Sequence, residues 1–130
     1  MAHHNEARIR EGYEAFTTGN MEYFPEELWT EDIVWHSGGH SSLAGDYKGA
    51  QEVLGFFGQL FERSGGTLRV ELHDALANDQ HGTAMHFATA ERGGATLHAE
   101  EILIFHFRGD RVSEIWSQAH DQAASDTFWG

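Results

Sequence analysis

Two side chains of this sequence have the type and the setting for proton transfer, His36 and Glu101. His36 ends the apolar run 33–35, which is typical of a buried strand, and precedes the flexible glycine pair at 38–39. An imidazole there can face a pocket and remain within reach of a ligand, and its usual pKa of about 6.5 suits proton transfer near neutral pH. We expect His36 to act as a general base. The alternative is a partly buried histidine bonded to a backbone carbonyl.

Glu101 is singled out by strand alternation in residues 98–107. It shares one face of that strand with apolar neighbours, Ala99, Leu103, Phe105 and Phe107. Burial among hydrophobic side chains disfavours the charged form of a carboxylate, which would let it donate or shuttle a proton. The alternatives are a structural ion pair with His36 or another histidine, or a one-residue bulge that puts Glu100 in its place.

Six further side chains are expected to line or gate a small-molecule pocket. They are Tyr13, Trp35, His40, Phe57, His86 and Trp116. Flat aromatic walls suit an apolar cyclic ligand. The ten histidines do not predict a metal site, because His36 and His40 flank a loop and zinc needs three or four converging ligands. We also expect no cofactor, since the sequence has no phosphate loop, dinucleotide motif or serine nucleophile elbow.

The first half of the chain predicts three helices and one strand. Apolar residues at helical spacing predict a helix over residues 5–18, which Gly19 and Asn20 end. A short helix over 23–29, a strand over 33–36, a glycine-rich loop to residue 48 and a helix over 49–62 follow. The third helix is expected to bury Phe57.

The second half predicts an antiparallel meander. Alternation begins at residue 68, and the turns Asn78–Asp79, Gly93–Gly94 and Gly109–Asp110 separate runs of about ten residues. A last short helix is expected to start at Asp121, whose carboxylate could cap it. Helices packed on one face of a strongly curved, mostly antiparallel sheet make an α+β cone, formed by a single domain over residues 1–130.

The composition of the chain argues against some classes of binding partner. The chain of 130 residues has a formal net charge of −13, and its eight lysines and arginines are scattered, so nucleic acid is not an expected partner. It has no cysteine, and no apolar run approaches the length of a membrane span. We therefore expect a cytoplasmic protein with no membrane contact, whose partner is a small apolar molecule.

The order of these elements resembles the nuclear-transport-factor-2-like (NTF2-like, cystatin-like) superfamily. The resemblance covers almost the whole chain. It rests on three motifs: Asp32–Ile33–Val34–Trp35–His36, Tyr47–Lys48–Gly49 and Gly109–Asp110–Arg111–Val112. It is similar above all to the SnoaL-like branch of polyketide cyclases and ketosteroid isomerase relatives. The resemblance puts His36 where ketosteroid isomerases hold their aspartate base. It puts Gly12 and Leu103 where those enzymes hold oxyanion donors, so steroid isomerisation by that mechanism is not expected.

The resemblance therefore implies an isomerase- or cyclase-type enzyme that uses no cofactor. It would transfer protons on an apolar cyclic or polyketide-like molecule, with His36 as base and Glu101 orienting it or returning the proton. The alternatives are a binding domain without catalysis and an epoxide-hydrolase-like activity, because the fold alone does not give the reaction. A homodimer formed through the open face of the sheet is also implied.

Overall fold

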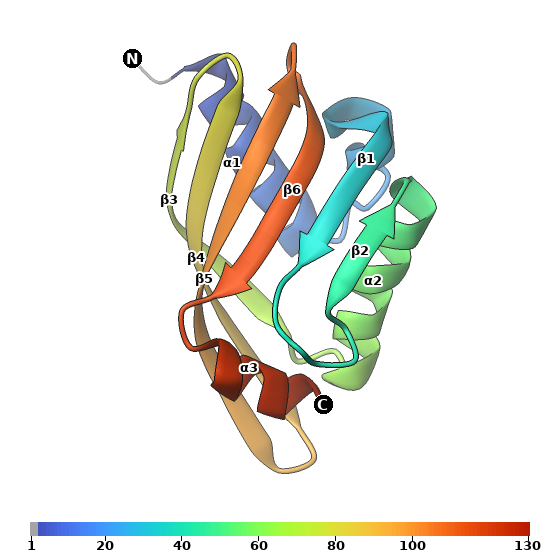
Figure 1. Cartoon of the computed structure of the whole chain (residues 1–130), viewed down its shortest axis with the longest axis vertical. Helices are drawn as coiled ribbons and strands as arrows, with labels where there is room; N and C mark the ends of the chain where they lie inside the picture. Colours follow the sequence, from blue (N-terminus) through green and yellow to red (C-terminus); the bar gives the residue numbers. More distant parts are fainter. Residues whose placement is uncertain (1–2) are drawn as a thin grey trace.

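The computed structural model describes residues 3–130 of the chain (Figure 1). Two elements precede the first strand: α1 (His4–Thr18) and the single π-turn η1 (Phe24–Leu28). The remaining elements are β1 (Trp29–Ser37), β2 (Gly45–Lys48), α2 (Ala50–Arg63), β3 (Arg69–Ala77), β4 (His81–Arg92), β5 (Ala95–Arg108), β6 (Arg111–Ala119) and α3 (Gln122–Trp129). The expected helices and the three meander turns are confirmed.

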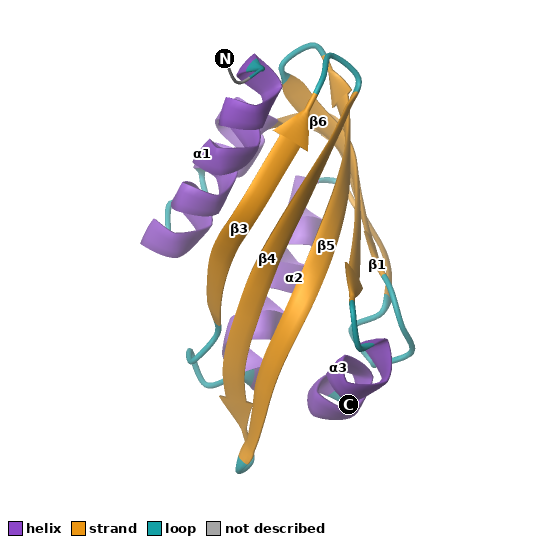
Figure 2. Ribbon diagram, turned by 90° about the vertical axis from the view of Figure 1, so that its left-hand side faces the viewer, coloured by secondary structure: helices purple, strands orange, loops and turns teal. Residues whose placement is uncertain are grey.

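The strands form one curved, open, mixed sheet in the order β2-β1-β6-β5-β4-β3 (Figure 2). The β1–β6 pair is parallel and the others are antiparallel. Register shifts between Leu72 and Asp74 and between His106 and Phe107 mark bulges, which increase local twist and bend the long strands. The fold is therefore the expected α+β architecture.

One strand departs from the prediction. Residues 45–48 were expected in the glycine-rich loop, but they form β2, which pairs with β1 from Val34↔Lys48 to Ser37↔Gly45. The segment is short and begins with Gly45 and Asp46, two residue types that are depleted in strands. Its strand propensity therefore does not predict a strand here. It is an edge strand that depends on the hydrogen-bonding edge of β1.

The helices α1 and α2 cover the concave face of the sheet, while α3 closes one end of it (Figures 1 and 2). The helix α1 lies very close to β4, since a Cβ on Gly82 would come within 2.7 Å of Ile9 Cδ1. Phe57 of α2 is central to the core and makes edge-on contacts with Phe16, Trp29 and Trp35. The apolar stripes predicted for both helices thus meet over the sheet.

The convex face of the sheet is left uncovered and carries apolar side chains. The large hydrophobic residues exposed there alternate with cavity-facing residues along β3, β4 and β5, and they are Leu76, Met85, Phe87, Ile102 and Ile104. This set is called the outer apolar face below. None of the helices in residues 3–130 is long and apolar enough to cross a membrane.

Candidate functional site: an apolar cavity with one polar wall

A cavity of about 150 Å³ lies between the helices and the concave face of the sheet. Aromatic and aliphatic side chains from every layer line it, among them Phe24, Trp29, Phe56, Leu103 and Ile115. Ligand pockets usually measure about 300 to 1,000 Å³, so this hollow is smaller than the sequence led us to expect. It is nevertheless open space in a core where close packing is the rule.

Three side chains from three elements make a continuous polar chain on the cavity wall. The Tyr13 hydroxyl lies 2.5 Å from Nδ1 of His86, and Nε2 of the same ring lies 2.6 Å from Oε1 of Glu101. His86 is 7% exposed and the side chain of Glu101 is 25% exposed, so the imidazole is enclosed while the carboxylate remains reachable from the cavity. Both ring nitrogens of His86 are therefore engaged.

The fold explains how these residues meet. His86 and Glu101 are directly paired across β4 and β5, so alternation sends both to the concave side. Tyr13 lies one helical turn after Ile9 on the stripe of α1 that faces the sheet. Burial, and then the nearby charge of Glu101, raise the pKa of Tyr13. Tyr13 consequently stays a neutral phenol and acts as a hydrogen-bond donor.

A second group of polar residues lies where α3 closes the cavity. Ser117 accepts a hydrogen bond of 2.9 Å from Nε1 of Trp35, and Gln122 and Asp126 of α3 are bonded to each other at 3.0 Å. All four side chains line the cavity. Neither Gln122 nor Asp126 was expected at the site, because both come from a helix whose position relative to the sheet no local pattern reveals.

The glycine-rich loop that follows β1 is hydrogen-bonded to α3, the helix that closes the cavity. The His40 backbone N–H donates to Oδ2 of Asp126 at 2.9 Å. Gly39 has a φ of 92°, and a Cβ there would lie 2.3 Å from Oδ1 of Asp126 and 2.4 Å from Nε2 of Gln122. Only glycine allows the loop to approach α3 so closely.

Five of the eight predicted site residues border this cavity. Tyr13, Trp35, Phe57, His86 and Glu101 all do. The other three do not: the His40 side chain and the residues His36 and Trp116 are absent from the lining. The structure therefore does not bring His36 and Glu101 to one hollow, and the expected convergence of these two groups is wrong.

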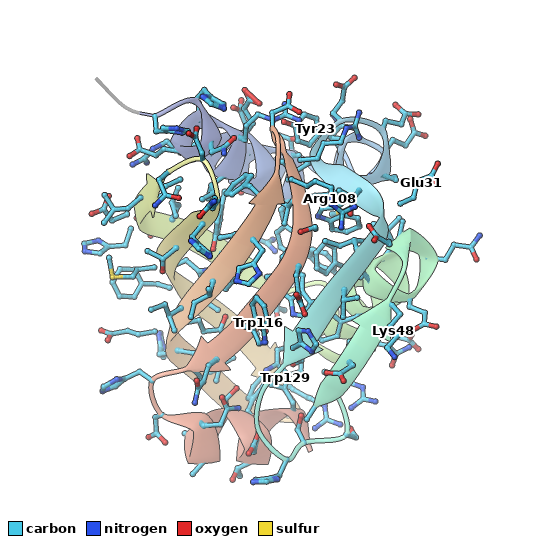
Figure 3. The ribbon with its side chains drawn as sticks, turned by 45° about the horizontal axis from the view of Figure 1, so that its top comes forward. Tyr23, Glu31, Lys48, Arg108, Trp116 and Trp129 are labelled. Carbon is cyan, nitrogen blue, oxygen red and sulfur yellow. The ribbon has the colours of Figure 1, made fainter. Side chains whose placement is uncertain are left out.

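His36 lies on the convex side of the sheet, because its strand neighbour Trp35 faces the cavity and adjacent residues of a strand face opposite ways. Its Nδ1 lies 2.6 Å from Asp46 and its Nε2 lies 2.6 Å from Glu114. The ring stacks on Trp116, which stands on β6 beside β1 (Figure 3). The His36 imidazole, which was expected to be a free base, is thus in contact with two carboxylates and an indole.

The protonation of His36 follows from these neighbours. Partial burial lowers the pKa of His36, but the hydrogen bonds to Glu114 and Asp46 and the charges of both carboxylates outweigh it, and the net pKa is raised. The imidazolium form is favoured by an anion at each nitrogen. His36 is therefore a structural bridge between β1, β2 and β6.

The resemblance puts no donor at Gly12, but Tyr13 was expected to line or gate the pocket, and it does border the cavity. Gly12 is buried against η1, where a Cβ would lie 3.0 Å from Leu28 Cδ2, so a larger side chain at position 12 would crowd Leu28. Tyr13 places its hydroxyl on the cavity wall, while Leu103 is apolar lining as expected. A donor is present, one position away from the place that the resemblance indicated.

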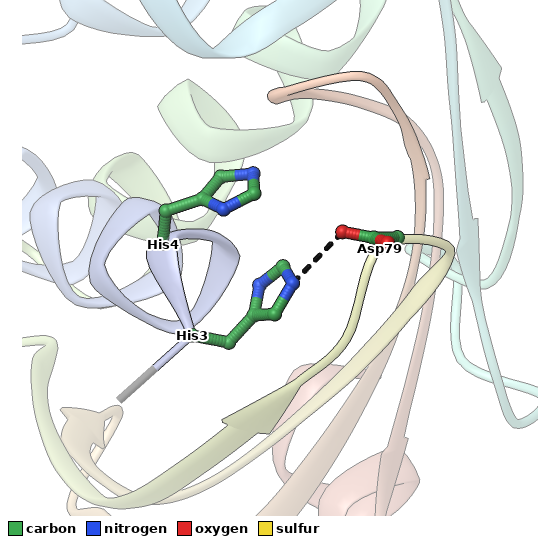
Figure 4. A group of neighbouring side chains, drawn as sticks. All are labelled: His3, His4 and Asp79. Atoms are coloured by element: carbon green, nitrogen blue, oxygen red, sulfur yellow. Dashed lines mark hydrogen bonds and ion pairs between the residues drawn. The ribbon is translucent and has the colours of Figure 1, made fainter. Parts of the chain in front are cut away.

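A separate histidine group lies at the start of α1. Among residues 3–130, the donor atoms of His3, His4 and Asp79 lie within 4.8 Å of one another (Figure 4). Nδ1 of His3 accepts the Asn5 backbone N–H as a helix cap, and Nε2 lies 2.9 Å from Asp79. Both nitrogens of His3 are thus already used. This contact joins α1 to the β3–β4 turn.

The fold agrees with comparisons to known proteins. Residues 9–115 match the model of the SnoaL-like domain family. A solved structure of Bal32a, from a soil-derived mobile gene cassette, is 35% identical with a TM-score of 0.91, covering 97% of this chain and 96% of that one. A putative SnoaL-like polyketide cyclase from Jannaschia sp. CCS1 is 14% identical with a TM-score of 0.78, covering 96% and 90% of the two chains.

Among curated proteins, an uncharacterized protein of Mycobacterium tuberculosis (strain ATCC 25618 / H37Rv) is 27% identical over 122 residues. The alignment covers 93% of this chain and 92% of that protein. Other structural neighbours are described as NTF2-like, including one from Burkholderia xenovorans LB400. The chain belongs to the SnoaL-like domain family and has the fold of NTF2-like proteins.

Proposed function

We propose that this protein is a cofactor-independent acid/base enzyme that moves a proton on an apolar cyclic molecule. The observation that carries the proposal is the hydrogen-bonded chain Tyr13–His86–Glu101 on one wall of an otherwise largely apolar cavity. A carboxylate provides the base and a phenol provides the donor, and a partly dry cavity strengthens both interactions. Neighbours such as the putative cyclase from Jannaschia are compatible with this class of chemistry.

Glu101 is the proposed base. Within residues 3–130 its Oε1 is bonded to His86, which leaves Oε2 free to take a proton from a carbon next to a substrate carbonyl. The electron pair of that C–H bond moves toward the carbonyl and gives an enolate. When the substrate has a double bond next to that carbon, the enolate is conjugated with it, and return of the proton to the far end of the double bond yields an isomer, so no electron or co-reactant is needed.

Tyr13 is the proposed donor to the enolate oxygen, and His86 is a positioning residue. When His86 is protonated, its Nε2–H donates to Glu101 and its Nδ1–H donates to the Tyr13 oxygen, at the distances given above. The Tyr13 hydrogen is then free to point at the substrate oxygen. When His86 is neutral, Tyr13 donates to Nδ1 instead. The histidine thereby couples the donor to the base.

The test needs no knowledge of the natural substrate. Cyclohexanone has exchangeable protons next to its carbonyl, and their exchange with deuterated water is followed by NMR. The protein is expected to accelerate this exchange, and Glu101→Gln should reduce the acceleration by about two to four orders of magnitude. Glu100→Gln is the matched control, since Glu100 is exposed on the opposite face of β5. Equal exchange by wild type and Glu101→Gln would remove Glu101 from the role.

A second candidate function is ligand binding without turnover. It is favoured by the cavity volume of about 150 Å³, which is small for an enzyme pocket, and by the complete engagement of His86. A ligand that raises the melting temperature of the protein without any proton exchange would support this function.

We also propose that two copies associate through the outer apolar face. Five large hydrophobic side chains are exposed there, with Ile104 at 45% and Ile102 at 42%, and contiguous apolar patches on soluble proteins often mark interfaces. The stacked pair His36 and Trp116 lies on the same side of the sheet. Sedimentation of a monomer at micromolar concentration would contradict this assembly.

A further inference from the structure

The volume and the lining residues of the cavity indicate the size and charge of its ligand. A volume of about 150 Å³ equals that of an engineered protein cavity that binds benzene. A single six-membered ring therefore fills the space, and fused ring systems exceed it. Among the apolar cyclic or polyketide-like molecules that the resemblance implies, the volume therefore favours those with one ring.

Apart from the histidine, the ionisable side chains that line the cavity in the described residues are carboxylates and a phenol. No lysine or arginine belongs to the lining in the part of the chain that the structure describes, whereas Glu101 and Asp126 both do. The whole chain has a formal net charge of −13. An anionic ligand would lose its hydration inside the hollow and meet a carboxylate there, without a lysine or arginine to compensate for either cost.

The polar wall also selects a hydrogen-bonding pattern. Oε2 of Glu101 offers an acceptor and the Tyr13 hydroxyl offers a donor, within one chain of hydrogen bonds. A neutral hydroxyl or carbonyl group matches this pair. An ammonium group satisfies only the carboxylate and must be dehydrated among aromatic side chains.

We propose, resting on the function proposed above, that the ligands of this site are neutral single-ring molecules with one hydroxyl or carbonyl group, and that the site rejects carboxylates. Trp35 limits the ring from the side of β1, and its bond to Ser117 at 2.9 Å fixes the indole. Glu101 is then both the proposed base and the residue that excludes anions.

The test compares four small probes by NMR titration of the folded protein. Benzyl alcohol is neutral with one ring, benzoate is the anion, benzylamine is the cation, and 2-naphthalenemethanol adds a second ring. Benzyl alcohol is expected to bind at least about tenfold more tightly than each of the others. That factor corresponds to about 1.4 kcal/mol. Equal or tighter binding of any other probe, or no binding of benzyl alcohol, would overturn the proposal.

Two variants test whether Glu101 is the residue that excludes anions. Glu101→Gln keeps the shape of the side chain and removes its charge, so benzoate should bind about tenfold more tightly than it does to wild type. Glu100→Gln removes the same charge from the opposite face and should leave benzoate unchanged. Selectivity that persists in Glu101→Gln would overturn the assignment. Because binding is measured without turnover, this result is independent of the deuterium exchange experiment.

Discussion

His86 and Glu101 face each other across β4 and β5, and Nε2 of the imidazole lies 2.6 Å from Oε1 of the carboxylate. Tyr13 lies 73 residues before His86 along the chain and completes the arrangement from α1. A buried polar group that loses a partner pays the full cost of its dehydration. The chain of three residues should therefore respond as a unit.

Replacing Tyr13 by Phe removes the hydroxyl and leaves Nδ1 of His86 without its partner at 7% exposure. We expect the free energy of unfolding to fall by about 1 to 3 kcal/mol. Urea denaturation measures it. In the double variant Tyr13→Phe/His86→Leu the loss should be smaller than the sum of the single losses, because the two residues share a bond. Strict additivity would show that the two side chains do not interact.

His36→Gln should change the pH dependence of stability. The raised pKa of His36 means that the folded state holds the proton more tightly than the unfolded state. The stabilisation is therefore fully present below about pH 6.5 and is lost as the pH rises through the folded-state pKa. The difference in urea midpoint between wild type and His36→Gln should be larger at about pH 6 than at about pH 9.

The same variant separates the two histidines functionally. Because His36 lies on the convex side, His36→Gln should leave deuterium exchange of cyclohexanone within about threefold of wild type, whereas His86→Gln should slow it by about two orders of magnitude or more. A large loss of deuterium exchange in His36→Gln, at unchanged stability, would show instead that His36 is the base.

Gly39→Ala should loosen the end of the cavity. The new Cβ would meet the side chains of Asp126 and Gln122 at 2.3 and 2.4 Å, and the φ of 92° is unfavourable for alanine. Gly65→Ala is the control, since its φ of 59° is also positive but its Cβ would meet no atom within 4 Å. We expect Gly39→Ala to cost about 1 to 3 kcal/mol more than the control. Equal melting temperatures would contradict the tight contact.

Ile104→Lys tests association through the outer apolar face. Ile104 is 45% exposed, so a lysine there is tolerated in the monomer but places a charge in the proposed interface. Sedimentation should show a weaker dimer for this variant. Thr17→Lys on α1 adds the same charge to an exposed position away from the sheet and should leave the sedimentation coefficient unchanged.

The sequence predicted the long elements because their periodicity is strong. Turn residues at Asn78, Gly93 and Gly109 located the meander, and alternation alone placed Glu101 on the concave face. The same rule explains the main error. Trp35 and His36 were both assigned to the pocket, yet neighbours in a strand face opposite sides, so only one of them could lie there.

The remaining differences come from long-range packing. No local pattern indicates that Tyr13 would meet His86, or that Asp46 and Glu114 would enclose His36 from two neighbouring strands. The resemblance indicated the right elements but shifted the phenol to Gly12. The position of α3, which brings Gln122 and Asp126 to the cavity, depends on how the complete sheet curves.

The four indoles of this chain are divided between the two sides of the sheet. Trp29, Trp35 and Trp129 border the hollow, while Trp116 stands with His36 on the other side. Their intrinsic fluorescence therefore contains two separate reporters. With Trp116 replaced by Phe, emission follows occupancy of the interior alone, and any spectral change that disappears with that substitution originates at the convex surface.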